Sequence, residues 1–170
     1  DVAQGRCSLG SAVVEHPRLP GLFLLTAPVR TRGRPVTETQ MADLLAEISP
    51  VLAKRESRFI LVTMAAVLPI ARIQELAGGT YPVIRIMPNT PAAIGEGMIL
   101  YACGEGVTKT EEKVFLDAMT GAGRFSSLPE KLIDAGSAVS GCGPAFVDMF
   151  IEALADGGVA CGLPRLSLKT

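Results

Sequence analysis

The turn Met64-Ala65-Ala66 is the first segment whose residue types suit ligand binding. It follows an apolar run at 59–63 that has the length and composition of a buried strand. In open α/β sheets, ligands bind beyond the carboxyl ends of the strands. Small side chains at 65 and 66 would let a flat ligand ring approach the backbone closely. A plain tight turn explains the same residues, and the pattern alone favours that simpler interpretation.

Pro88 and Asn89 occupy the equivalent place after the next apolar run, 83–87. The two prolines, Pro88 and Pro91, restrict the backbone to extended conformations. The amide of Asn89 and the hydroxyl of Thr90 offer hydrogen bonds to a ligand, or only to the loop's own backbone groups. The sequence leaves the ligand-facing and the structural role evenly balanced.

The third segment has the composition Ser-Gly-Cys-Gly, which could suggest an exposed nucleophile. A nucleophilic serine or cysteine needs a base, and the only histidine, His16, lies in a stretch of different character. The sequence therefore disfavours covalent catalysis. We expect Gly141 and Gly143 to allow close helix packing, and Ser137 or Ser140 to present a hydroxyl to the site or to a partner subunit.

Hydrophobic periodicity predicts the elements that would position these segments. In chain order they are helix 41–55, strand 59–63, helix 69–76, strand 83–87, strand 98–103, helix 111–119 and strand 123–127. The strand–helix–strand order over 59–87 is a βαβ unit, which implies a parallel sheet and a right-handed crossover. The predicted fold class is therefore α/β with a parallel sheet.

After residue 127 the chain is predicted to be helical. A short helix at 128–135 leads into a small-residue turn, and Pro144 suits the first turn of the next helix, where its missing N–H has no intrahelical partner. The apolar face of this helix consists of Phe146, Met149, Phe150, Ala153 and Leu154. Gly162 and Pro164 are expected to end it. Glu152 and Asp156 share a face that we interpret as solvated.

Residues 1–40 differ in character from the rest of the chain. They are rich in arginine and proline, with little periodicity and one predicted strand at 22–25. A dinucleotide-binding half would open with a strand and a G-x-G-x-x-G turn, so that a helix N-terminus meets the pyrophosphate. The glycines here do not have that spacing.

The composition excludes several classes of protein. The net charge of −1 argues against nucleic-acid binding, which needs a basic excess. Four cysteines without a CxxC pair and a single histidine offer no metal site, and indicate free thiols in a reducing cytoplasm. No uninterrupted apolar run reaches the roughly 18–20 residues that span a membrane.

Two blocks of sequence resemble pyrroline-5-carboxylate reductases. The first is SAVSGCGPAF at 137–146, followed by IEALADGGVACGLPR, and the second is VIRIMPNTPA at 83–92. Their order and spacing agree with that family over about residues 41–165. The resemblance implies three parts: an unmatched segment at 1–40, the C-terminal half of a Rossmann-like dinucleotide-binding domain at 41–127, and the beginning of an all-helical dimerisation domain at 128–170.

The resemblance also implies a chemistry. Members of this family transfer hydride from NADPH or NADH to the C=N carbon of 1-pyrroline-5-carboxylate and so make L-proline. Met64, Ala65, Ala66, Pro88 and Asn89 would then lie on the cofactor side of the site. Ser137, Ser140, Gly141 and Gly143 would lie on the substrate side or at the subunit interface. The expected partners are the small-molecule substrate and a second copy of the chain.

The chain also departs from the family's pattern. Val67 stands where the family has a glycine, the Gly-rich phosphate loop is not recognisable, and the family's carboxylate-binding loop would follow the last residue. These departures leave two alternatives: a non-catalytic remnant of a frame-disrupted gene, or another Rossmann-type hydroxyacid dehydrogenase. Without further dimerisation helices, the apolar face of Phe146–Leu154 is expected to cause aberrant association.

Overall fold

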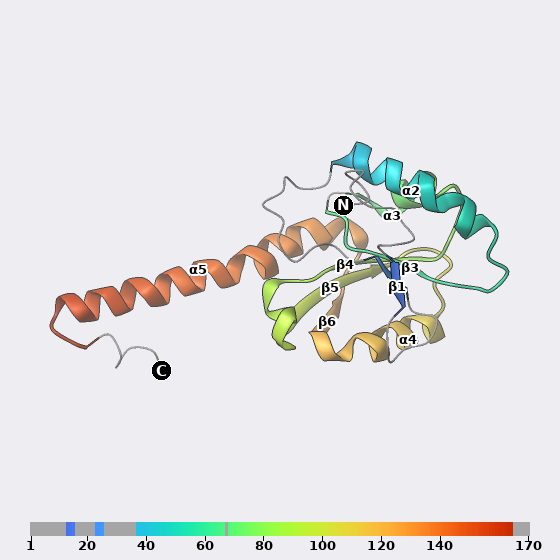
Figure 1. Ribbon diagram of the computed structural model, residues 1–170. Helices are drawn as coiled ribbons and strands as arrows, with labels where there is room; N and C mark the ends of the chain where they lie inside the picture. Colours follow the sequence, from blue (N-terminus) through green and yellow to red (C-terminus); the bar gives the residue numbers. More distant parts are fainter. Residues whose placement is uncertain (1–12, 16–22, 26–36, 67, 165–170) are drawn as a thin grey trace. The chain divides into compact units, whose positions relative to one another are not determined.

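The computed structural model describes residues 13–15, 23–25, 37–66 and 68–164 (Figure 1). They form an α/β fold with two sheets, one of two strands and one of four in the order β3-β4-β5-β6. The chain divides into two compact units. The first unit comprises residues 1–85 and 103–121, and the second comprises 86–102 and 122–170.

The two-stranded sheet lies in the first forty residues. β1 (Val13–Glu15) pairs antiparallel with β2 (Phe23–Leu25), and Val14 faces Leu24. The predicted strand at 22–25 is confirmed for residues 23–25, whereas β1 was not predicted. The rest of the arginine- and proline-rich segment lies outside the described residues.

Helix α2 (Glu38–Ala53) begins with a capping box. The Thr37 hydroxyl accepts from the N–H of Gln40, and the Gln40 side chain accepts from the N–H of Thr37. This reciprocal pair satisfies two donors that have no intrahelical partner, so the helix starts three residues before the predicted position. In the first unit α2 packs beside α3 (Ile70–Ala77), as Figure 1 shows.

The predicted βαβ unit is confirmed in the first compact unit. β3 (Leu61–Thr63) pairs parallel with β4 (Val83–Met87), with Leu61 opposite Val83. Helix α3 connects them and ends at Gly78, whose φ of 75° is in the left-handed region. Ile73 and Ala77 of α3 are buried, at 1% and 0% exposure.

The second unit contains the other pair of strands. β5 (Gly97–Cys103) pairs parallel with β6 (Gly123–Ser127), and Gly97 lies opposite Gly123. The rings of Tyr101 and Phe125 meet edge to face, 6.3 Å apart. Ile99 is 1% exposed, so this pair contributes to the core.

The four-stranded sheet is mixed, not wholly parallel. β4 and β5 are neighbours, and the N–H of Gly104, just after β5, donates to the carbonyl of Val83 at the start of β4. β5 therefore runs opposite to β4. The expectation of a parallel sheet holds for β3/β4 and β5/β6 but not for the middle pair. A connection of only nine residues separates β4 from β5, and parallel neighbours need a longer crossover.

Helix α4 (Lys109–Met119) lies between β5 and β6 in the sequence. It starts with a second capping box. The Thr108 hydroxyl accepts from the N–H of Glu111, and the Glu111 carboxylate accepts from the N–H of Thr108. Phe115 is its buried residue. The helix predicted at 111–119 is confirmed and extends two residues further toward the N-terminus.

The prediction of a turn at the small-residue motif is wrong. Helix α5 (Ile133–Ala160) runs without interruption through the motif, and Pro144 lies inside it (Figure 1). A short 3₁₀ turn, η4 (Glu130–Leu132), precedes it. The helix ends at Cys161 followed by Gly162, with φ of 93°, so the predicted end is confirmed. Small residues favour a turn, which is why the sequence predicted one. Within the 28 residues of the helix, however, Pro144 removes only one N–H donor.

One helical stretch of the described chain, 130–160, is long and apolar enough to cross a membrane by length and composition. A window of 18 residues within it has a mean hydropathy of 1.3, and no part of that window is buried inside the structure. The sequence expectation concerned only uninterrupted apolar runs. This helix is not one of them, because α5 also contains glycines and acidic residues. A helix that packs against a partner helix passes the same test, so this is a weak indication.

Candidate functional site

The turn after β3 exposes small and apolar side chains. Met64 is 63% exposed, Ala66 is exposed, and Ala65 is half-buried. The N–H of Ala65 donates to the Thr63 hydroxyl at 3.2 Å. This bond holds the turn in place, and the side chains of Met64 and Ala66 remain exposed.

The segment after β4 is a short, ordered connection. Pro88 and Asn89 are half-buried and lead into the 3₁₀ turn η2 (Thr90–Ile94), which ends at Gly95 with φ of 82°. Asn89 is extended, and its carbonyl accepts from the N–H of Ala92 at 3.1 Å. The backbone of the loop is thus tied to itself at its start.

The Asn89 side chain makes two further hydrogen bonds within the second unit. Its Nδ2 donates to the carbonyl of Ser140 at 2.9 Å, and its Oδ1 accepts from the N–H of Met98 at 2.9 Å. Because Met98 supplies an N–H and Ser140 a carbonyl, the partners fix the orientation of the amide. These bonds support the structural role that the sequence left balanced against a ligand-facing one.

The four predicted interface residues lie together in the first half of α5. Ser137, Ser140 and Gly143 are half-buried, and Gly141 is exposed. A Cβ added at Gly143 would meet nothing within 4 Å, and one at Gly141 would meet only the Ser137 hydroxyl at 3.6 Å. Among the described residues, no other element therefore packs closely against these two glycines.

Within α5, the glycine that permits close packing is Gly136, which was not predicted. A Cβ there would lie 2.7 Å from the Leu100 side chain and 3.0 Å from that of Leu128. The first turns of α5 therefore approach β5 closely. Its place three residues after buried Ile133, on the same helical face, was the only available signal.

An ion-pair network in the first unit was also missed. The Arg58 guanidinium donates to both carboxylate oxygens of Glu111 and to the carbonyl of Gly106, the latter at 2.7 Å. The N–H and hydroxyl of Thr108 donate to Glu111 as well, at 2.8 Å each. The network joins the segment before β3 to the start of α4, which are 53 residues apart in sequence.

This network predicts an acid-dependent contribution to stability. The Arg58 guanidinium, followed by the N–H and hydroxyl of Thr108, lowers the pKa of Glu111 to about 2. A lowered folded pKa stabilises the protein above the unfolded value of about 4.3 and loses that effect as pH falls toward 2. We expect Glu111→Gln to lower the melting temperature at pH 7, with a difference from wild type that shrinks between about pH 4.3 and 2.

The control is Glu47→Gln, at an exposed position of α2. It removes the same charge without touching Arg58, so its melting temperature should stay close to wild type at pH 7. A Glu111→Gln difference that is constant from pH 7 to 2 would contradict this assignment. Thermal unfolding followed by circular dichroism supplies both curves.

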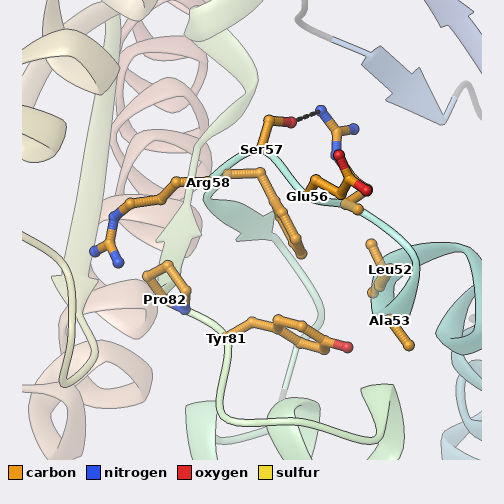
Figure 2. Close-up of a pocket in the computed structure, with 9 residues that line it drawn as sticks. Leu52, Ala53, Glu56, Ser57, Arg58, Tyr81 and Pro82 are labelled. Atoms are coloured by element: carbon orange, nitrogen blue, oxygen red, sulfur yellow. Dashed lines mark hydrogen bonds between the residues drawn. The ribbon is translucent and has the colours of Figure 1, made fainter.

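A surface hollow of about 530 Å³ lies away from the predicted site residues. Leu52, Ala53, Glu56, Tyr81 and Pro82 are among the residues lining it (Figure 2). These residues precede β3 and β4, so the hollow lies at the amino ends of these strands.

The arginines of this hollow already have partners. Arg55 lies 5.3 Å from the centre of the Phe59 ring and donates to the Ser57 hydroxyl, the dashed line in Figure 2. Arg58 is held by Glu111. We assign no ligand to this hollow.

The cysteines form no visible pair in the described chain. Cys103, Cys142 and Cys161 are free thiols, as predicted, and Cys7 lies outside the described residues. Burial, followed by the negative charge of Glu112, raises the pKa of the Cys103 thiol. Among the residues described, no cluster of three potential metal ligands occurs.

Comparisons with known proteins agree with the resemblance drawn from the motifs. Residues 130–169 match the family model for pyrroline-5-carboxylate reductase dimerisation. The matched range contains all of α5, which carries the Ser-Gly-Cys-Gly-Pro segment.

The curated relatives have the same name. A pyrroline-5-carboxylate reductase of Glycine max is 41% identical over 128 residues, which is 75% of this chain and 45% of that protein. The enzyme of Corynebacterium melassecola is 36% identical over 129 residues, covering 76% of this chain and 48% of the relative. The chain thus spans a little under half the length of the curated relatives it matches.

A solved structure supports the fold and the relationship. The crystal structure of the Plasmodium falciparum pyrroline carboxylate reductase with NADP bound is 35% identical, with a TM-score of 0.66. The match covers 75% of this chain and 49% of that one. Over about three quarters of its length this chain is therefore similar to pyrroline-5-carboxylate reductases in sequence and fold, and residues 130–169 match the dimerisation region of that family.

Proposed function

We propose that this chain is part of an NAD(P)H-dependent reductase that converts 1-pyrroline-5-carboxylate to L-proline. The observation that carries the proposal is the 41% identity over 128 residues to a protein of that name. The bound NADP in the Plasmodium falciparum structure supports a nicotinamide cofactor here. NADPH and NADH both remain within the proposal.

The cofactor would supply the hydride, which adds to the C=N carbon of the cyclic imine while the ring nitrogen gains a proton. Nothing in this reaction requires a covalent enzyme intermediate. The part of this chain is therefore to bind and orient cofactor and substrate.

The residues that follow β3 fit a flat nicotinamide ring. Met64 is 63% exposed and can cover one ring face, while Ala65 and Ala66 leave the backbone accessible. β3 and β4 run parallel, so their carboxyl ends share one edge of the sheet, where ligands bind in α/β folds. We assign Met64, Ala65, Ala66, Pro88 and Asn89 to the cofactor side of the site.

The second half of α5 fits an interface with another copy of the chain. Phe146, Met149 and Phe150 are 68%, 66% and 64% exposed, which is unusual for a helix on a monomer surface. We therefore propose that Ser137, Ser140, Gly141 and Gly143 lie at the substrate side or subunit interface. In this proposal residues 41–127 belong to the dinucleotide-binding domain, 128–170 to the dimerisation domain, and the protein works in the cytoplasm.

The direct test is an assay of NADPH oxidation with 1-pyrroline-5-carboxylate, followed at the absorbance of the reduced cofactor. NADPH binding by fluorescence gives a second readout that does not need turnover. We expect turnover and binding in the full protein that contains this chain. Cofactor binding without turnover of 1-pyrroline-5-carboxylate or of a 3-hydroxy acid would indicate the non-catalytic remnant. Turnover of a 3-hydroxy acid alone would indicate the hydroxyacid dehydrogenase.

A further inference from the structure

Pro144 creates a gap in the hydrogen bonding of α5. In an α-helix the carbonyl of residue 140 accepts from the N–H of residue 144, and proline has no N–H. The carbonyl of Ser140 therefore has no donor at the usual place in the helix. Backbone polar groups in partly buried positions need a partner, so this carbonyl is expected to find one elsewhere.

Asn89 supplies that partner. Its Nδ2 donates to the Ser140 carbonyl at 2.9 Å in a partly buried position. The same amide accepts from the N–H of Met98 at 2.9 Å, at the start of β5. One side chain thus joins the loop after β4, the first residues of β5 and the middle of α5, all within the second unit.

We propose that Asn89 is a positioning residue that replaces the N–H missing at Pro144 and so holds the loop after β4 against α5. The loop lies at the sheet edge assigned to the cofactor, and α5 carries the proposed interface. Asn89 would thereby link the geometry of the two. The effect on turnover rests on the proposed function, whereas the structural coupling between positions 89 and 144 does not.

This place requires an amide side chain, because the contact uses both a donor and an acceptor of the same group. Aspartate could still accept from the Met98 N–H, but its carboxylate oxygen would face the Ser140 carbonyl without a hydrogen between them. Alanine would lose both bonds. The pair Asn89→Asp and Asn89→Ala therefore separates the two halves of the contact.

The test is a double-mutant cycle with Asn89→Ala and Pro144→Ala in the full protein. Alanine at 144 restores an N–H that can donate to Ser140 within the helix. We expect Asn89→Ala to lower the melting temperature by about 4–8 °C. In the Pro144→Ala background, Asn89→Ala should lower the melting temperature by about half as much. There the N–H of residue 144 already donates to the Ser140 carbonyl, so the loss of Asn89 leaves only the Met98 N–H without its partner. Equal losses in both backgrounds would overturn the proposal.

The matched control is Pro50→Ala, at the proline inside α2. It also restores a helix N–H, but far in sequence from the Asn89 contact. It should therefore leave the Asn89→Ala loss unchanged. A reduction as large as that from Pro144→Ala would show a general gain in helix stability and would overturn the proposed coupling.

Two further readouts separate positioning from stability alone. Amide hydrogen exchange at Met98 should be about tenfold faster in Asn89→Ala and close to wild type in Asn89→Asp. With pyrroline-5-carboxylate and NADPH, Asn89→Ala should lower kcat about tenfold at temperatures where it is fully folded, and Pro144→Ala should restore part of it. Unchanged kcat would overturn the positioning role. A wild type without turnover would refute the proposed function, while the thermal cycle and Met98 exchange would still decide the link between loop and helix.

Discussion

Replacing Phe150 with aspartate is expected to weaken the proposed self-association through α5 by at least about 100-fold. Phe150 is 64% exposed on α5, between Phe146 and Leu154 on the same helical face. Burial of roughly 100 Å² per phenylalanine contributes about 2.5 kcal/mol, and a twofold interface counts it twice, which corresponds to more than 100-fold in Kd. Aspartate would also bring a charge into the apolar contact, which adds to the loss.

Sedimentation of the wild type and the variant over a range of concentrations measures this effect. The control is Glu152→Gln on the acidic side of α5, where Asp148 and Asp156 are its neighbours. It removes one charge and leaves the apolar face intact, so its dissociation constant should remain near the wild-type value. If Phe150→Asp associates as tightly as Glu152→Gln, the apolar face of α5 is not the contact between copies.

The elements from residue 41 onward could be predicted because each carries a local signal. β4 is a continuous apolar run interrupted only by Arg85, and four of its five residues are buried. α3 shows the 3.6-residue period and ends at glycines, one of which adopts the expected left-handed conformation. Such signals depend only on residues near one another in the sequence, so a single sequence is enough to detect them.

The middle of α5 shows where local signals mislead. Serines, glycines and a proline within eight residues are typical of a turn, and the prediction followed that composition. In the structure the helix continues, and the Ser140 carbonyl, which has no donor at Pro144, accepts a hydrogen bond from Asn89, 51 residues earlier. No periodicity or propensity in 137–146 contains that contact.

The candidate site was predictable only in outline. The carboxyl ends of β3 and β4 could be located from their apolar runs, and the turns after them are exposed or half-buried as a binding edge requires. The two bonds of the Asn89 amide could not be predicted, because the partners Met98 and Ser140 belong to different elements. The Arg58–Glu111 pair was missed for the same reason.

Gly123→Ala is expected to destabilise the second unit strongly. Gly123 has φ of 131°, which side chains rarely adopt, and it lies opposite Gly97 in the parallel pair β5/β6. A Cβ at this position would overlap the backbone oxygen and nitrogen of Gly97. Strain and overlap each cost about 1–3 kcal/mol, so we expect a total loss of about 3–5 kcal/mol in the free energy of unfolding.

Gly121→Ala, two residues earlier, is the matched control. A Cβ there would meet nothing within 4 Å, and its φ lies outside the left-handed region. The same substitution should therefore change the free energy of unfolding by less than about 0.5 kcal/mol.

Urea unfolding of the two variants compares them directly. Equal stabilities would mean that β5 and β6 can separate at little cost, and that the close approach of Gly97 and Gly123 does not hold the second unit together. A large loss confined to Gly123→Ala would show that the close approach of Gly97 and Gly123 stabilises the second unit.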